Sequence, residues 1–156
     1  KAVKEFCLKR WPITYDDRQL RIGVLAYRSV GIFERLDAQM LIPLYPTPYS
    51  LRLHLLDEIS TKGGSPTGEA LRYATMILAE SFRGEKRIKL ISDGENTFGA
   101  APLTFLPELR SRGIRVDTIL IGGAVSDVMR ALSAETGGEH TVAHSLEDLF
   151  AAINKP

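Results

Sequence analysis

The stretch RIKLISDGEN, residues 87–96, decides the fold that this chain adopts. Residues 87–92 predict a β-strand, which Asp93 and Gly94 end as a turn pair. Upstream, the apolar residues within 66–81 fall on one stripe at helical spacing. A helix followed by a strand suggests a sheet built from alternating elements.

The alternation continues toward the C-terminus. We expect next a helix within residues 102–112, which begins or kinks at Pro107, and then strands at residues 114–121 and 139–143. A further helix starts near Val125 and ends at Gly137, because glycine readily adopts the conformation of a helix C-terminus. The last helix follows Ser145 and Asp148, whose spacing is that of a capping box.

Before residue 63 the periodicity is weaker. Four elements are predicted there: a helix to about residue 10, a strand at 21–27, an edge strand at 40–45 and a helix at 51–59. Strands that alternate with helices imply parallel pairing, right-handed crossovers and helices on both faces of the sheet. We therefore expect an α/β fold with a mostly parallel sheet between two layers of helices.

Length and composition limit what the chain can be. Its 156 residues and 17.3 kDa suit a single domain, residues 1–156, and its formal charge of +1 indicates neither a nucleic-acid nor an anionic-membrane partner. No apolar run approaches the roughly 20 residues of a membrane span. The single cysteine, Cys7, excludes an intramolecular disulfide and a cysteine-based metal site. Nothing in the sequence indicates a compartment.

Ligands of such sheets bind beyond the carboxyl ends of the strands, and two loops expected there carry suitable chemistry. Residues 63–68 (GGSPTG) place hydroxyls at a helix start, and residues 92–97 (SDGENT) place a carboxylate at a strand tip. Hydroxyl and carboxylate oxygens from separate loops are the ligands of a hard cation such as Mg²⁺. The plainer interpretation makes Ser65 or Thr67 a helix N-cap and Asp93 a turn residue.

Three segments together resemble the von Willebrand factor type A family. They are GGSPTGEAL, IKLISDGEN, and the run from GIRVDTILIGG through ALSAETGG to AHSLEDLFAAI. The resemblance covers nearly the whole chain in order. It implies a three-layer, doubly wound, Rossmann-like domain with a metal-ion-dependent adhesion site, usually holding Mg²⁺ or Mn²⁺. It also implies a protein partner, often one whose acidic side chain completes the coordination shell.

The resemblance assigns roles to residues of the two loops. Ser65 falls where the family commonly has a threonine ligand, Asp93 falls on the carboxylate ligand, and Thr67 is a substitute ligand. The loop-forming glycines are Gly63, Gly64 and Gly94. Glu95 and Asn96 would lie on the rim that faces a partner.

One family motif is missing. No Asp-x-Ser-x-Ser occurs in the sequence, and the chain begins at what resembles the helix that normally follows this motif. We expect the central first strand to lie upstream of Lys1, leaving an N-terminally truncated domain with unpaired strand edges. With only two of the usual five protein ligands, metal binding should be weak or absent, and association or strand swapping could compensate for the missing strand.

Our main hypothesis is therefore a non-enzymatic protein-binding module. Its rival is a scaffold domain of a larger assembly, without a working metal site. A phosphoryl-transfer or hydrolytic enzyme that uses Asp93 with Mg²⁺ needs a second acid and a substrate-gripping base, and we identify neither. The histidines His54, His140 and His144 are interpreted as surface or strand-end residues, because the segment between the last two is predicted as a strand.

Overall fold

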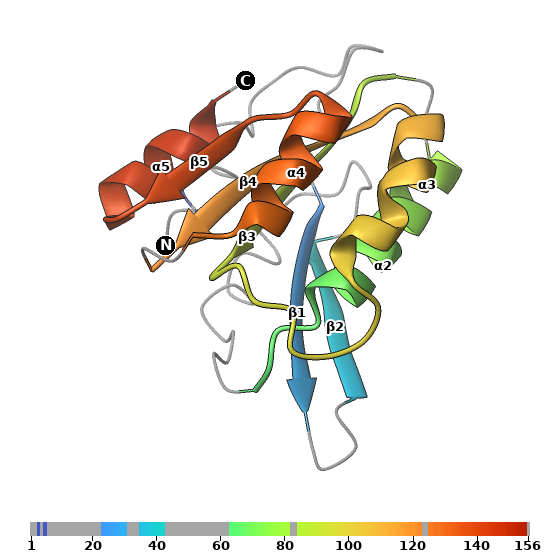
Figure 1. Cartoon of the computed structure of the whole chain (residues 1–156), viewed down its shortest axis with the longest axis horizontal. Coiled ribbons are helices and arrows are strands. Elements are labelled where there is room, and N and C mark those ends of the chain that lie inside the picture. Colours follow the sequence, from blue (N-terminus) through green and yellow to red (C-terminus); the bar gives the residue numbers. More distant parts are fainter. Residues whose placement is uncertain are drawn as a thin grey trace.

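The computed structural model describes residues 3, 5, 23–30, 35–42, 63–81, 84–122 and 125–155. Val3 and Glu5 are helical. The other elements, shown in Figure 1, are β1 (Val24–Val30), β2 (Arg35–Ile42), α2 (Thr67–Ser81), β3 (Lys86–Ser92), the 3-10 helix η3 (Pro102–Phe105), α3 (Leu106–Ser111), β4 (Ile114–Ile121), α4 (Asp127–Thr136), β5 (His140–Ala143) and α5 (Leu146–Asn154).

A parallel sheet of order β3-β4-β5 organises the C-terminal half. Alternate residues of β4 face opposite sides, as the period of a strand requires. On one side Val116 and Leu120 join a buried cluster with Leu71 of α2, Leu109 of α3 and Leu132 of α4. On the other side Ile119 packs with Ala152 and Ile153 of α5, and Val3 packs against them. Helices therefore cover both faces, and the expected three-layer α/β fold is confirmed.

The strands β1 and β2 form a separate antiparallel hairpin. Its strands run in a clearly different direction from those of the parallel sheet in Figure 1. Among the described strands, no ladder of hydrogen bonds joins β1 to β3. The hairpin contacts the rest of the described chain mainly through α2, which packs against β1, β2 and β3.

The boundaries of the hairpin correct two predictions. The first strand runs over Val24–Val30 instead of 21–27, and the second over Arg35–Ile42 instead of 40–45. The second strand ends directly before Pro43, because proline has no N–H to give to a ladder. Residues 35–40 (RLDAQM) alternate polar and apolar residues, which is itself the pattern of a half-buried strand. The prediction followed the apolar run at 40–45 and overlooked this alternation.

Helix ends in the C-terminal half follow the sequence signals. Gly137 caps α4 with a left-handed φ of 71°, and Ser145 and Asp148 form the predicted capping box at α5. The helix expected within residues 102–112 is α3, which begins next to Pro107 and follows the 3-10 turn η3. Pro107 lies in the first turn of α3, where its missing N–H leaves no helical bond unmade.

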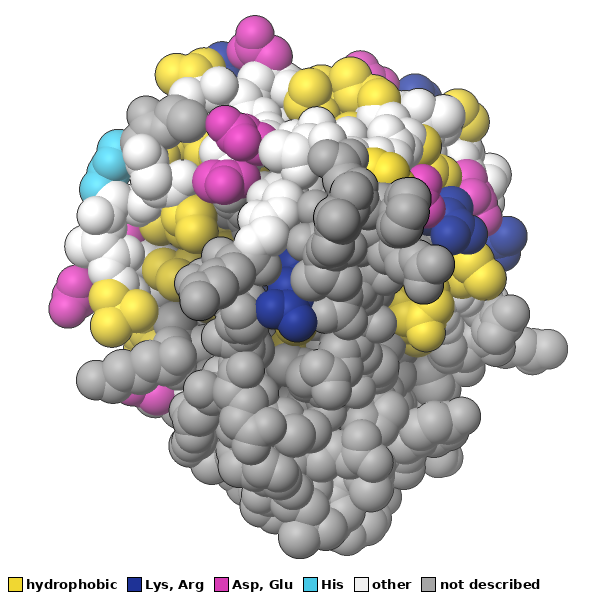
Figure 2. Space-filling view, turned by 90° about the horizontal axis from the view of Figure 1, so that it is seen from below, with side chains coloured by type: hydrophobic (Ala, Val, Ile, Leu, Met, Phe, Trp, Pro, Cys, Tyr) yellow, Lys and Arg dark blue, Asp and Glu magenta, His cyan; other side chains and the backbone are white. Residues whose placement is uncertain are grey.

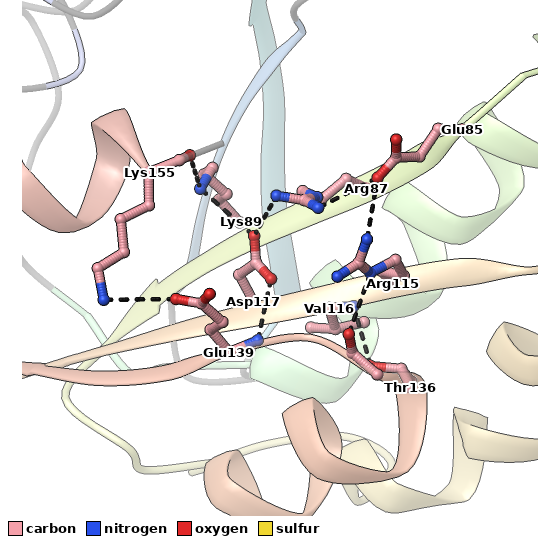
Figure 3. Close-up of polar contacts among 10 residues, drawn as sticks. Glu85, Arg87, Lys89, Arg115, Val116, Asp117, Thr136, Glu139 and Lys155 are labelled. Atoms are coloured by element: carbon pink, nitrogen blue, oxygen red, sulfur yellow. Dashed lines mark hydrogen bonds and ion pairs between the residues drawn. The ribbon is translucent and has the colours of Figure 1, made fainter.

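A network of charges ties the three parallel strands together (Figure 3). Asp117 of β4 is 5% exposed, and its Oδ2 lies 3.4 Å from a guanidinium nitrogen of Arg87 and 3.3 Å from Lys89 Nζ, both on β3. Its Oδ1 accepts a 3.0 Å bond from the amide of Glu139, which directly precedes β5. Lys89 Nζ also donates to the carbonyl of Lys155, just beyond α5. One buried carboxylate thus links β3 to the start of β5.

Some predictions lie outside the described residues. These are the helix at 51–59, the helical run to residue 10 apart from Val3 and Glu5, and the surroundings of Cys7 and His54. Within the described ranges, no helix combines the length and apolarity that a membrane crossing needs.

Candidate functional site

The two candidate loops meet at the carboxyl end of β3. The Ser65 amide donates to Thr97 Oγ1 at 2.7 Å, and the Thr97 amide donates back to the Ser65 carbonyl at 3.0 Å. The Gly68 amide donates to Asn96 Oδ1 at 2.9 Å. Bonds between residues about 30 positions apart hold the loops as one unit, so Ser65 and Asp93 lie at the same end of the molecule.

Ser65 and Asp93 keep oxygen atoms free of hydrogen bonds to the described residues. The backbone of Ser65 bonds to the other loop, whereas its hydroxyl has no hydrogen-bond partner there. Asp93 is exposed, and its Oδ1 accepts a 3.2 Å bond from the Glu95 amide, while Oδ2 accepts none from the described chain. These two groups have acceptor capacity to offer a cation or a polar partner.

Thr67, the predicted substitute ligand, has a structural role. The residue is 3% exposed, and its hydroxyl donates a 2.8 Å bond to the carbonyl of Glu95. Because α2 begins at Thr67, this bond fastens the start of the helix to the loop after β3. An oxygen that gives away its proton can still accept a bond, but its burial limits what can reach it.

Position 94 requires a glycine. Its φ is +92°, and a Cβ there would lie 2.8 Å from both Leu120 Cδ1 and Ser126 Cβ. The Ser126 hydroxyl donates to the Gly94 carbonyl at 3.3 Å while it also caps α4. The loop after β3 is therefore fixed by the start of α4 as well as by α2. Sequence patterns gave no signal for the contact between Gly94 and Ser126.

The two residues predicted to face a partner, Glu95 and Asn96, differ in exposure. Glu95 is exposed, whereas Asn96 is half-buried and is bonded to the Gly68 amide and, at 3.4 Å, to the carbonyl of Ala100. Asp127, at the start of α4, has a side chain that is 94% exposed. Figure 2 shows acidic, basic and apolar side chains together on the coloured part of the face seen from below in Figure 1. The charged residues of the two loops are therefore the exposed carboxylates Asp93 and Glu95.

A residue that the sequence did not single out reaches this site from the hairpin. The Tyr27 ring packs against the main core cluster, and its hydroxyl donates to the carbonyl of Ile91 at 3.5 Å. Burial raises the pKa of Tyr27, hydrogen bonding with the side chains of Thr67 and Ser92 opposes that rise, and the nearby charge of Asp93 adds to it. The phenol therefore stays protonated at neutral pH.

The two histidines that the structure describes, His140 and His144, lie at opposite ends of β5. His140 Nδ1 lies 2.8 Å from Thr118 Oγ1 in the parallel sheet, and His144 follows the end of β5. Burial lowers the pKa of His140, and the charge of Arg130 lowers it further. Within the described ranges, no group of three or more His, Cys, Asp or Glu residues is placed to hold a metal ion.

With this geometry established, the comparison with known families is decisive. The chain matches the von Willebrand factor type A domain, abbreviated VWA, over residues 8–155. The chain belongs to this family. The resemblance of the loop motifs is thereby confirmed, and VWA domains act as protein-interaction or scaffold modules.

Solved structures share the fold at low sequence identity. A von Willebrand factor type A structure from Catenulispora acidiphila is 18% identical, with a TM-score of 0.73 over 97% of this chain and 36% of that one. Proximal thread matrix protein 1 from the mussel byssus is 21% identical, with a TM-score of 0.72 over 97% and 39%. The conserved hypothetical protein BatB from Bacteroides thetaiotaomicron is 18% identical, with a TM-score of 0.65 over 97% and 82%.

These likenesses support the fold alone, because all three identities are low. The chain spans less than two fifths of the first two proteins and most of the third. No match was found among curated proteins.

Proposed function

We propose that this VWA domain, taken as one unit over residues 1–156, is a non-enzymatic protein-binding module. Its binding surface is the rim formed by residues 63–68 and 92–97, with Glu95 and Asn96 facing the partner. A divalent cation, Mg²⁺ or Mn²⁺, binds weakly there through Ser65 and Asp93, with Thr67 as a substitute ligand. The observation that carries the proposal is the direct bonding of the two loops at the end of β3.

The donor set suits a hard cation but is small. A hydroxyl and a carboxylate are oxygen donors of the kind that Mg²⁺ prefers, and their loops are already held together before any ion arrives. Two protein ligands leave most of the coordination shell to water, so we expect saturation only at metal concentrations on the order of millimolar.

The negative charge of the rim explains why an acidic partner would need a bound cation. Asp93, Glu95 and Asp127 would repel an acidic side chain of a partner. A divalent ion beside Asp93 offsets that repulsion and offers a coordination site to the incoming carboxylate. We therefore expect binding of an acidic protein segment to require Mg²⁺ or Mn²⁺, and to weaken when the ion is removed.

The test is a Mn²⁺ titration of the whole chain by isothermal calorimetry, compared with two loop variants and one control. Asp93→Ala should abolish the heat of binding, and Ser65→Ala should weaken binding at least threefold. Glu135→Ala is the matched control, because Glu135 is an exposed carboxylate at the far end of α4, paired only with Arg110 in the described chain.

Each outcome decides between two functions. Loss of Mn²⁺ binding in Asp93→Ala, with binding kept in Glu135→Ala, supports the metal-assisted module. Equal heats in all four proteins, or no heat in any, would leave a scaffold domain without a working metal site. The scaffold interpretation is favoured by Thr67, because its buried hydroxyl is already hydrogen-bonded to the backbone of the other loop.

A further inference from the structure

Three exposed aliphatic side chains lie at the carboxyl ends of β4 and β5, and we name them the apolar patch. Ile121 is the last residue of β4 and is 37% exposed. Val125, directly before the cap of α4, is 77% exposed, and Leu146, the first residue of α5, is 46% exposed. Single exposed aliphatic residues are ordinary on a protein surface, whereas a group of them at one edge of a sheet marks an interaction surface.

The apolar patch adjoins the rim. Ile121 is the ladder partner of Ala143, so the end of β4 lies beside the end of β5 and the nearby start of α5. Val125 is tied to the rim through its neighbour in the chain, because the Ser126 hydroxyl donates a 3.3 Å bond to the Gly94 carbonyl. The loop after β3 and the apolar patch therefore form one continuous edge of the domain.

The loops around the apolar patch are acidic. Residues 92–97, 121–127 and 144–148 contain five Asp or Glu residues and no Lys or Arg, although the whole chain has a formal charge of +1. All five carboxylates are exposed. Asp127 has an ion pair in the described chain, a 3.8 Å contact with Arg130 of α4. Figure 2 shows apolar side chains next to acidic ones on the described part of this face. The edge thus combines apolar surface with negative charge.

We propose that this edge binds a protein segment in which bulky apolar side chains are flanked by Lys or Arg. The apolar side chains cover the patch, and the cations pair with Asp127 and Glu147, which lie two residues and one residue beyond Val125 and Leu146. Nucleic acids and anionic lipid headgroups are repelled by the same carboxylates, so charge complementarity favours a protein partner. The inference rests on the proposed function only in taking the rim as the binding surface. A partner that also uses the cation places its own carboxylate at Asp93.

The test is an NMR titration of the whole ¹⁵N-labelled chain, in buffer with a chelator, with a short peptide of leucines and lysines that is blocked at both ends. The peptide should shift amides within residues 93–97 and 144–148 and around Val125, with a dissociation constant below about 1 mM. Peptides with serine in place of leucine, or glutamate in place of lysine, should bind at least fivefold more weakly. Raising the salt concentration from about 50 to about 300 mM should weaken the leucine–lysine peptide about threefold, because salt screens exposed charges.

Variants of the chain separate the apolar from the charged contribution. Val125→Ser and Leu146→Ser should each weaken the leucine–lysine peptide about fivefold, since each removes apolar surface that the peptide covers. Met76→Ser is the matched control and should leave binding unchanged, because Met76 is 44% exposed but lies about two and a half turns into α2. The double variant Asp127→Asn, Glu147→Gln should reduce both the affinity and its dependence on salt. All these side chains are exposed, so the variants should fold.

The outcomes distinguish this inference from the metal proposal, because the peptide contains no carboxylate and is titrated without metal. If the peptide binds at this edge while the natural chain gives no heat with Mn²⁺, the basic partner stands and the metal proposal fails. If Asp93→Ala abolishes Mn²⁺ binding but the peptide shifts none of these amides, the metal proposal stands and the basic partner is wrong. Equal binding of the leucine and serine peptides, or an equal loss of affinity in Met76→Ser, would overturn the inference, because the apolar patch would then have no part in binding.

Discussion

The two halves of this molecule are held in different ways. The parallel sheet β3-β4-β5 has helices on both faces, and Val116 of β4, Leu109 of α3 and Leu132 of α4 are fully buried. The described residues of β1, by contrast, are half-buried from Val24 to Arg28, and the strand pairs only with β2 in the described chain. The parallel half therefore holds the described core, while the hairpin brings the side chain of Tyr27 close to the rim.

Truncating one leucine in each half should show the largest difference between the two halves. Leu132→Ala empties a fully buried position in α4 and should cost about 3–4 kcal/mol of unfolding free energy. Leu25→Ala, in half-buried β1, should cost about 1 kcal/mol, since less surface is lost. Urea denaturation followed by circular dichroism measures both. Equal costs would show that the hairpin is as much a part of the core as α4.

A second prediction concerns the charge network of the parallel half. Asp117→Ala should destabilise the domain by about 2 kcal/mol, because Arg87 and Lys89 lose a buried counter-charge and the Glu139 amide loses its acceptor. Asp127→Ala, which removes a carboxylate whose pair with Arg130 is 3.8 Å long, should change stability by less than about 0.5 kcal/mol. Thermal unfolding in parallel scans compares the two. If Asp117→Ala lost no more stability than Asp127→Ala, the charge network would not stabilise the domain.

The smallest expected effect is a pH dependence from His140. Because burial and then Arg130 lower its pKa below the ordinary value of 6.5, the unfolded chain binds the proton more readily than the folded one. Its contribution to stability is therefore complete above pH 6.5 and is lost as the pH falls through the lower, folded-state pKa. His140→Gln should flatten that part of the stability profile between pH 7.5 and 5. An unchanged profile would mean that His140 does not contribute.

Local signals in the sequence account for most of the parallel half. The glycine at 137 and the pair Ser145 and Asp148 predicted helix ends that the structure confirms, because caps depend on residues within one turn. The period of β4 likewise predicted a strand with the observed bounds. These features need no knowledge of the rest of the chain.

The rim could be predicted only in part. The motifs indicated which loops meet, but the bonds of Ser65 with Thr97 and of Asn96 with Gly68 join residues that no local pattern connects. Tyr27 was missed for the same reason, since its partner Ile91 lies 64 residues away. Thr67 was predicted as a substitute ligand. In the structure its hydroxyl joins the two loops, because a hydroxyl at a helix start can bond to the backbone that packs beside it.

The proposed cation site is tested most directly by the pattern of paramagnetic broadening that Mn²⁺ causes in an NMR spectrum of the uniformly ¹⁵N-labelled chain. A cation shared by the two loops should broaden amides of residues 64–67 and 93–97 together at low metal concentration, and leave those near Glu135 sharp. Broadening confined to one loop, or centred on the carboxylates of α4 or α5, would contradict a site built from Ser65 and Asp93.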